Sequence, residues 1–279
     1  MMHLHAVILN YTTLQPSDRI KTETKMPAPQ YTLIDTLPAL ASMLSDISDL
    51  PDSPPPLYLD LEGERLGRDG TIAIMQIYVL PQNHTYLLDI TTLGRRAFTF
   101  RGSNQTTKNL KAILESSSIT KCLFDVRNDA DALFNLYDIS LQGAQDIQVM
   151  NYAAREARRG AFRRGNLVMG LAKCIATDSG LSTNALADFR RKKQEGGKIF
   201  NPELGGSYAV FSERPLRKDV MEYCVGDVVY LPVLWRKYND VLEGQGRLRS
   251  KVQGATLGRL GAAKKPPVPD GKWKANGPW

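Results

Sequence analysis

The segment Leu-Tyr-Leu-Asp-Leu-Glu at residues 57–62 limits the possible folds of this chain more than any other. Side chains two residues apart in a β-strand point to the same face, so leucines occupy one face here and Asp60 and Glu62 lie on the other. We expect a half-buried strand with two carboxylates pointing the same way. The chain must therefore fold around a strand that presents paired negative charge.

Two later segments add acidic residues in defined local settings. Asp129 follows Asn128, a good helix-capping residue, and the apolar residues after it recur at helical spacing. We expect Asp129 in the first turn of that helix. Tyr223 and Asp227 are four residues apart within a helical pattern, so a phenol and a carboxylate share one helix face.

Together these residues can form a metal-binding cage. Like charges repel, so carboxylates that converge from three distant segments need a cation between them. Mg²⁺ or Mn²⁺ suits carboxylate oxygens, and two such ions roughly 3.5–4 Å apart can activate a water and stabilise the leaving oxygen at a phosphodiester. The tyrosine hydroxyl would orient that water. Taken singly, each motif has a plainer explanation: a chance pair, a helix cap, or a packed ring beside a solvated charge.

The order of the motifs, Asp-x-Glu, then Asp, then Tyr-x-x-x-Asp, resembles that of the DEDDy 3'-to-5' exonucleases of the ribonuclease D type. The resemblance covers roughly residues 31–242, and its first and last motifs are most similar to the branch of Egalitarian-like proteins and their fungal relatives. It implies that Asp60 and Asp227 bridge or hold two metal ions. It also implies that Glu62 orients the water and helps to bind one ion, and that Asp129 acts partly through water.

The chain departs from the ribonuclease D pattern at several positions. Leu61 and Gly63 replace a threonine and an aromatic residue, which affects expected substrate contacts more than metal binding. Asp125 stands in the second motif as a competing candidate, but we prefer Asp129 because the apolar spacing after it aligns with the family's helix. The histidine subtype is set aside, because no histidine lies near the third motif.

Basic residues outweigh the acidic ones, with a formal net charge of +7 and a pI of about 9.2. A positive surface around an acidic site suits a polyanion gripped along its backbone. Two clusters are candidates for this nucleic-acid-binding surface; the plainer explanation is solvated helix ends and loops. The glycines near them indicate mobile loops. The candidate residues are Arg158, Arg159, Arg163, Arg164, Arg190, Arg191, Lys192 and Lys193.

The periodicity predicts an α/β protein. We expect a disordered arm at 1–30, an exonuclease domain at 31–242, and a basic tail at 243–279 that contains Trp273 and Trp279 and docks on the domain, stacks on a base or binds a partner. By family analogy the fold is ribonuclease H-like, a mixed sheet that starts with an antiparallel meander and is flanked by helices. The expected strands cover 57–62, 71–79, 85–90 and 119–124, and the expected helices 37–47, 107–116, 147–158, 167–176, 182–193 and 216–238, besides the one that carries Asp129.

The three cysteines form no Cys-x-x-Cys pair and lie in apolar segments, which is typical of reduced core residues in an intracellular protein. We expect no membrane span and no signal peptide, and a location in the cytoplasm, nucleus or mitochondrion. Protein partners are unknown from the sequence.

The sequence therefore predicts a metal-dependent exonuclease that releases nucleoside 5'-monophosphates from single-stranded 3' ends, with RNA favoured over DNA by the family alone. Two alternatives stay open. One is a nucleic-acid-binding adaptor of the same fold with weak or no activity. The other, which is weaker, is a protein-interaction scaffold that does not bind nucleic acid.

Overall fold

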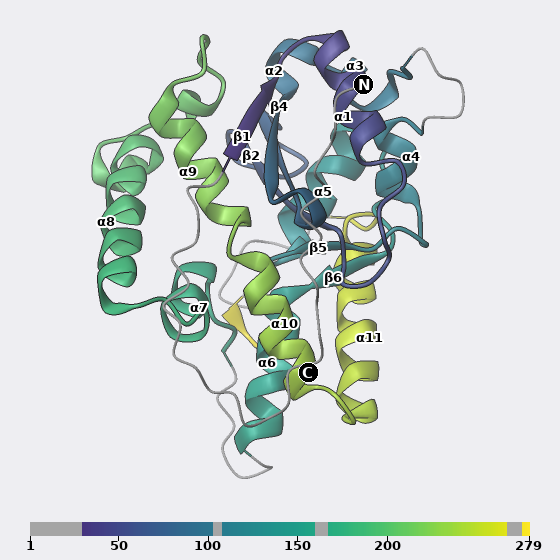
Figure 1. Cartoon of the computed structure of the whole chain (residues 1–279), viewed down its shortest axis with the longest axis vertical. Helices are drawn as coiled ribbons and strands as arrows, with labels where there is room; N and C mark the ends of the chain where they lie inside the picture. The colour runs from purple at the N-terminus through teal and green to yellow at the C-terminus, as the bar shows by residue number, and fades with distance from the viewer. Residues whose placement is uncertain (1–29, 103–107, 160–166, 267–274) are drawn as a thin grey trace, which may run out of the picture.

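A six-stranded mixed sheet organises the molecule. The computed structural model describes residues 30–102, 108–159, 167–266 and 275–279, so residues 1–29 of the predicted arm lie outside the described residues. The strands follow the spatial order β1-β4-β3-β2-β5-β6 (Figure 1). Their bounds are β1 Gln30–Ile34, β2 Leu57–Glu62, β3 Ile74–Val79, β4 His84–Asp89, β5 Lys121–Leu123 and β6 Ala144–Asp146.

The pairing confirms the predicted meander. Strand β2 runs antiparallel to β3, with Asp60 opposite Gln76, and β3 runs antiparallel to β4. Strand β5 pairs parallel to β2, β6 parallel to β5, and β1 parallel to β4. The mixed α/β class is therefore confirmed, while β1 and β6, which are short and lack strong alternation, were not predicted.

Helices cover both faces of the sheet. They are α1 Leu37–Asp46, α2 Ile90–Leu93, α3 Arg96–Thr99, α4 Leu110–Glu115, α5 Val126–Tyr137, α6 Ile147–Arg159, α7 Leu171–Asp178, α8 Thr183–Phe200, α9 Lys218–Val228, α10 Leu231–Val241 and α11 Gly246–Ala262. Short 3₁₀ turns are η1 Leu80–Gln82, η2 Pro202–Leu204 and η3 Tyr208–Phe211. None of these helices is both long and apolar enough to cross a membrane, within the part of the chain that the structure describes.

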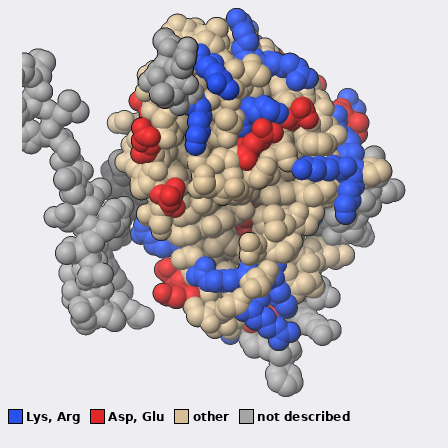
Figure 2. Space-filling view, turned by 90° about the vertical axis from the view of Figure 1, so that its right-hand side faces the viewer, with Lys and Arg blue, Asp and Glu red and all other residues tan. Residues whose placement is uncertain are grey.

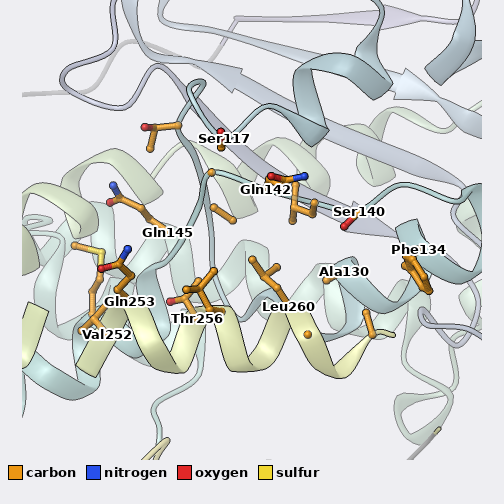
Figure 3. Close-up of a pocket in the computed structure, with 18 of the residues that line it drawn as sticks. Ser117, Ala130, Phe134, Ser140, Gln142, Gln145, Val252, Gln253, Thr256 and Leu260 are labelled. Atoms are coloured by element: carbon orange, nitrogen blue, oxygen red, sulfur yellow. The ribbon is translucent and has the colours of Figure 1, made fainter. Parts of the chain in front are cut away.

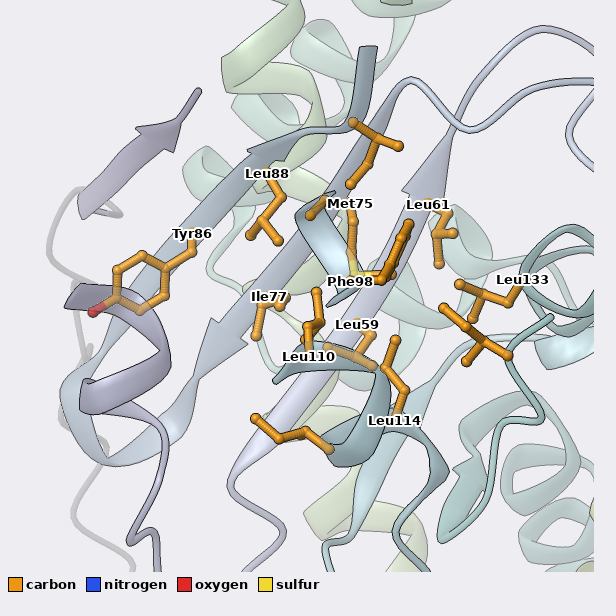
Figure 4. Packing of buried hydrophobic residues seen from close by; sticks show 14 of the residues in the cluster. Leu59, Leu61, Met75, Ile77, Tyr86, Leu88, Phe98, Leu110, Leu114 and Leu133 are labelled. Carbon is orange, nitrogen blue, oxygen red and sulfur yellow. The ribbon is translucent and has the colours of Figure 1, made fainter. Parts of the chain in front are cut away.

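Strand β2 buries its leucines, whereas Asp60 and Glu62 on the other face are partly exposed, which agrees with the predicted half-buried strand. Its leucines pack with α1, α3, α4 and α5 in one core, where Leu59 and Leu61 lie beside Phe98 and Leu133 (Figure 4). Tyr58, on the other face, belongs to a second core formed with α6, α7, α9 and α10. The alternation set the faces correctly, but it could not reveal that α9 covers the face that carries Asp60 and Glu62.

Several predicted helices differ in their bounds: α7 begins at Leu171 rather than at residue 167, and α8 continues to Phe200 rather than ending at residue 193. The pattern at 216–238 forms two helices, α9 and α10, and Pro232 lies in the first turn of α10. A proline there has no N–H to bond the preceding turn, so it cannot continue α9 and instead suits a helix start. Helix α5 begins at Val126 rather than after Asn128, although Asp129 still lies in its first turn.

The predicted tail contains a helix that composition did not indicate. Helix α11 is rich in glycine, yet it packs against α5, α6 and β6. Farther along, the Nε1 of Trp279 donates to Oε2 of Glu156 at 2.6 Å, and its ring meets that of Tyr152 edge to face. Trp273 lies outside the described residues. The described end of the chain thus lies against α6.

Candidate active site

Three carboxylates converge where α9 crosses β2. Strand β2 presents Asp60 and Glu62 on the face that α9 covers, and the last turn of α9 carries Asp227. One carboxylate oxygen of each of these residues lies within 4.8 Å of the other two. The structure therefore brings together acids from opposite ends of the predicted domain.

The fourth predicted acid lies nearby but outside this triad of oxygens. Asp129 projects from the first turn of α5 and is only 4% exposed. Burial raises its pKa, and so does the negative charge of Asp60. The competing candidate, Asp125, instead forms ion pairs with Arg127 at 2.6 Å and with Arg259 at 3.4 Å. Because arginines already pair with Asp125, Asp129 is the better candidate of the two.

The protonation of the cluster reflects its crowding. Burial and the charge of Asp227 raise the pKa of Asp60 to about 8. Burial and the charges of Asp60 and Asp227 raise the pKa of Glu62 well above its usual range. Carboxylates this close resist simultaneous ionisation unless a cation lies among them. Hard oxygen donors of this kind fit Mg²⁺ or Mn²⁺, so the residues present suit the predicted metal ions.

Tyr223 lies one helical turn before Asp227. Its ring packs between aromatic neighbours, with centroids 4.8 Å from Phe200 and 6.4 Å from Phe211. Burial raises the pKa of Tyr223, and the charges of Asp227 and Glu62 raise it further. The phenol therefore stays protonated near neutral pH and can donate a hydrogen bond.

Lys193 enters this cluster from α8. Its ammonium forms an ion pair with Asp227 and lies 4.2 Å from the centroid of the Tyr223 ring. Lys193 is one of the residues predicted to grip the nucleic-acid backbone, and the structure places it among the acids. Its spacing from Gly196 and Phe200, which puts all three on one face of α8, was the signal that could have identified it.

Gly196 permits the close approach of α8 to Tyr223. A Cβ at this position would lie 2.4 Å from Cδ2 of the Tyr223 ring. Gly196 and Gly197 lie inside an 18-residue helix, so the prediction that these glycines form mobile loops was wrong. The reason is local: Gly196 is needed for packing rather than for backbone freedom.

A matched pair of glycine substitutions tests this contact. In Gly197→Ala the new methyl would meet only Leu204 at 3.6 Å, so we expect the better helix propensity of alanine to raise the free energy of unfolding by about 0.5–1 kcal/mol. In Gly196→Ala we expect a loss of about 1–3 kcal/mol from overpacking against Tyr223. Urea unfolding measures both. Equal changes in the two variants would contradict the close packing.

A second network surrounds the start of α5. The Asp146 carboxylate is fully buried and accepts hydrogen bonds from the backbone N–H groups of Asp125 and Val126 at 3.0 and 3.3 Å. It also accepts from the N–H groups of Gln148 and Val149, in the first turn of α6. Arg259 of α11 binds Asp146 at 2.7 Å. Thus α11 supports the carboxylate that caps the helix bearing Asp129.

The predicted basic surface is only partly described. Arg158 is exposed at the end of α6, beside a pocket of about 490 Å³ whose lining includes Arg155 and Lys173. Arg163, Arg164 and the side chain of Arg159 lie outside the described residues.

On α8, local ion pairs offset part of the predicted charge. Arg190 is exposed, whereas Arg191 and Lys192 both pair with Asp188. On the face shown in Figure 2, basic side chains form separate groups, with acidic ones among the upper set. That face lies away from α8, so it does not show the cluster on this helix.

A cavity of about 720 Å³ lies away from the acids, between α11, α5 and the loops that precede β5 and β6 (Figure 3). Its lining includes Gln142, Gln253 and Thr256 and contains no carboxylate. It therefore shares no residue with the acidic cluster.

Comparisons with known proteins agree with this fold. The family model described as 3'-5' exonuclease matches residues 31–243. Similar solved structures include Trypanosoma brucei RNase D with GMP (TM-score 0.65, 20% identity, covering 88% of this chain and 67% of that one) and the same enzyme with RNA U12 (0.65, 20%, 87% and 74%). Escherichia coli RNase D is also similar (0.55, 21%, 88% and 53%). A search of curated proteins finds no match.

At these identities the solved structures establish the fold, a mixed sheet flanked by helices of the ribonuclease H-like kind seen in RNase D, as predicted. The chain spans about half the length of the Escherichia coli enzyme. The Egalitarian-like branch is not distinguished by these matches. Since the family model covers the sheet, α8 and the helix that carries Tyr223 and Asp227, the chain belongs to the 3'-5' exonuclease family.

Proposed function

We propose that this protein is a metal-dependent 3'-5' exonuclease that hydrolyses the terminal phosphodiester bond of single-stranded nucleic acid and releases nucleoside 5'-monophosphates. The observation that carries the proposal is the convergence of Asp60, Glu62 and Asp227 within 4.8 Å, beside a protonated Tyr223. Family membership supports the direction of attack. The proposal takes residues 31–242 as the exonuclease domain.

Each residue of the cluster has a proposed role. Asp60, Glu62 and Asp227 hold two Mg²⁺ or Mn²⁺ ions, with Asp129 joining through water. These ions would supply the positive charge that activates a water and stabilises the leaving oxygen. Tyr223 donates a hydrogen bond from its hydroxyl to position the attacking water, and this role is the ground on which the DEDDy subtype is proposed. The phenol suits this role because its raised pKa keeps the proton on the oxygen.

RNA is the proposed substrate in preference to DNA. The Trypanosoma brucei relative was solved with RNA U12, and the Escherichia coli relative is described as an exoribonuclease involved in structured RNA processing. The exposed Arg158 and Arg190 are proposed to hold the phosphate backbone. The other proposed contacts are Arg159, Arg163, Arg164, Arg191 and Lys192. An intracellular location is part of the proposal and is supported by three free, buried cysteines.

The test is a degradation assay with the wild-type protein. Single-stranded RNA and DNA labelled at the 5' end are incubated with Mn²⁺, Mg²⁺ or a chelator. We expect a ladder that shortens from the 3' end with either metal, faster on RNA, and no shortening with the chelator, because the carboxylates then lack their cations.

A circular RNA of the same sequence serves as the control, because it offers no 3' end. Cleavage of the circle would indicate an endonuclease. Metal-independent binding without shortening would indicate the adaptor instead, and neither binding nor shortening would indicate the scaffold.

A further inference from the structure

Among the residues that the structure describes, Lys193 is a cation that contacts the acidic cluster directly. Its ammonium pairs with Asp227 and faces the ring of Tyr223, the two residues of the last sequence motif. The same positive charge opposes the rise in the pKa of both Asp60 and Glu62. Lys193 thus borders the carboxylates and the phenol at once.

The position of Lys193 is fixed by helix packing. Gly196 and Phe200 follow it on the same face of α8, and both contact the Tyr223 ring. The side chain of Lys193 is 21% exposed, whereas that of Asp227 is 5% exposed. The ammonium therefore reaches the cluster from its solvent side, which is the side from which a nucleic-acid end must enter.

We propose that Lys193 is a further catalytic residue, whose ammonium binds a non-bridging oxygen of the scissile phosphate. This inference rests on the proposed exonuclease function. The scissile phosphate would lie between the metal-binding carboxylates and the water that Tyr223 positions. Lys193 contacts both Tyr223 and Asp227, so its ammonium is within reach of that phosphate. An ammonium there offsets negative charge on the phosphate oxygens in a site with little water.

The step balances without a proton from Lys193. The water oxygen forms a bond to phosphorus as the bond from phosphorus to the 3' oxygen breaks. The water releases a proton to solvent, and the departing 3' oxygen takes one from solvent. Lys193 stays protonated and moves from Asp227 to the phosphate. A counter-ion that only neutralises Asp227 would stay in place, and its removal would favour metal binding without slowing the reaction.

Two uncharged variants, Lys193→Met and Lys193→Gln, test the proposal beside Lys198→Met as a matched control. Lys198 is exposed on the same helix, so its removal changes the net charge equally. The assays measure kcat and KM on 5'-labelled single-stranded RNA at saturating Mn²⁺, the Mn²⁺ affinity of the metal-free protein by calorimetry, and the melting temperature.

We expect both uncharged variants to lower kcat by about 100-fold, because one preorganised charge contact is lost at the reacting centre. Their KM should stay within about threefold, and their Mn²⁺ affinity should be equal or tighter because a competing cation is gone. Lys198→Met should match the wild type in kcat. The glutamine variant decides the matter if the methionine variant does not fold.

Other outcomes overturn the proposal. An active wild type with unchanged or higher kcat in both uncharged variants would leave Lys193 as a counter-ion only. A rise in KM with kcat retained would make it a binding contact without a role in the chemical step. A wild-type protein that is inactive with both metals would contradict the proposed exonuclease function itself, and this inference would be contradicted with it.

Discussion

Replacing Asp60 with asparagine is expected to lower kcat by about 1,000-fold while leaving RNA binding within about threefold of the wild type. The carboxylate lies on β2 within 4.8 Å of Glu62 and Asp227, and its amide replacement is a poorer ligand for a hard cation. Single-turnover degradation of 5'-labelled RNA with Mn²⁺ measures the rate. Titration of labelled RNA in the presence of Ca²⁺ or chelator measures binding.

Asp69→Asn is the matched control, because it removes one exposed negative charge from the turn that follows β2. Its kcat should stay within twofold of the wild type. A wild-type rate in Asp60→Asn would remove Asp60 from the reaction and would contradict the proposed cluster.

Stability gives an independent readout for Asp60. Its pKa of about 8 lies above the value of 3.8 for a free aspartate, so between these values the folded metal-free protein holds a proton that the unfolded chain releases. The free energy of unfolding should therefore fall as pH rises from about 4 to 8. Asp60→Asn should reduce this slope, as measured by urea unfolding in chelator, because asparagine does not titrate.

The second large effect is expected from Arg259→Met, which should lower the free energy of unfolding by about 3 kcal/mol. Arg259 is 9% exposed and binds Asp146, which is fully buried, at 2.7 Å. Breaking a buried ion pair costs about 3–5 kcal/mol, and we expect the lower end because four backbone N–H groups still bind Asp146. Urea unfolding at pH 7 measures the change.

Arg247→Met is the control, because Arg247 lies on the exposed side of the same helix. It should change the free energy of unfolding by less than about 0.5 kcal/mol, as is usual for surface substitutions. Equal losses in both variants would mean that α11 contributes only its helix and not this ion pair. Helix α11 lies beyond residue 243, where the family match ends, so a truncation at that residue should also destabilise α5.

The sequence predicted those parts of the fold that local patterns determine. Alternation in residues 57–62 placed Asp60 and Glu62 on one face, and one helical turn placed Tyr223 beside Asp227. Both predictions depend on the side-chain periodicity of the strand and the helix, which does not depend on neighbouring elements.

Features set by distant residues were missed. Helix α5 starts two residues before Asn128 because Asp146, from another strand, caps it. Gly196 resembled a loop residue because the ring of Tyr223 that requires it belongs to another helix. Lys193 resembled a solvated surface lysine because its partner, Asp227, also belongs to another helix. In each case the deciding neighbour is far away in the chain, where no periodicity can reveal it.

The crossing of α9 over β2 also has a consequence for protein synthesis. Asp60 and Asp227 lie near opposite ends of the family-matched region, and both belong to the cluster. A chain that is still being translated lacks the complete set of carboxylates until α9 has left the ribosome. If the cluster is the nuclease centre, the nascent chain cannot degrade RNA before α9 has emerged.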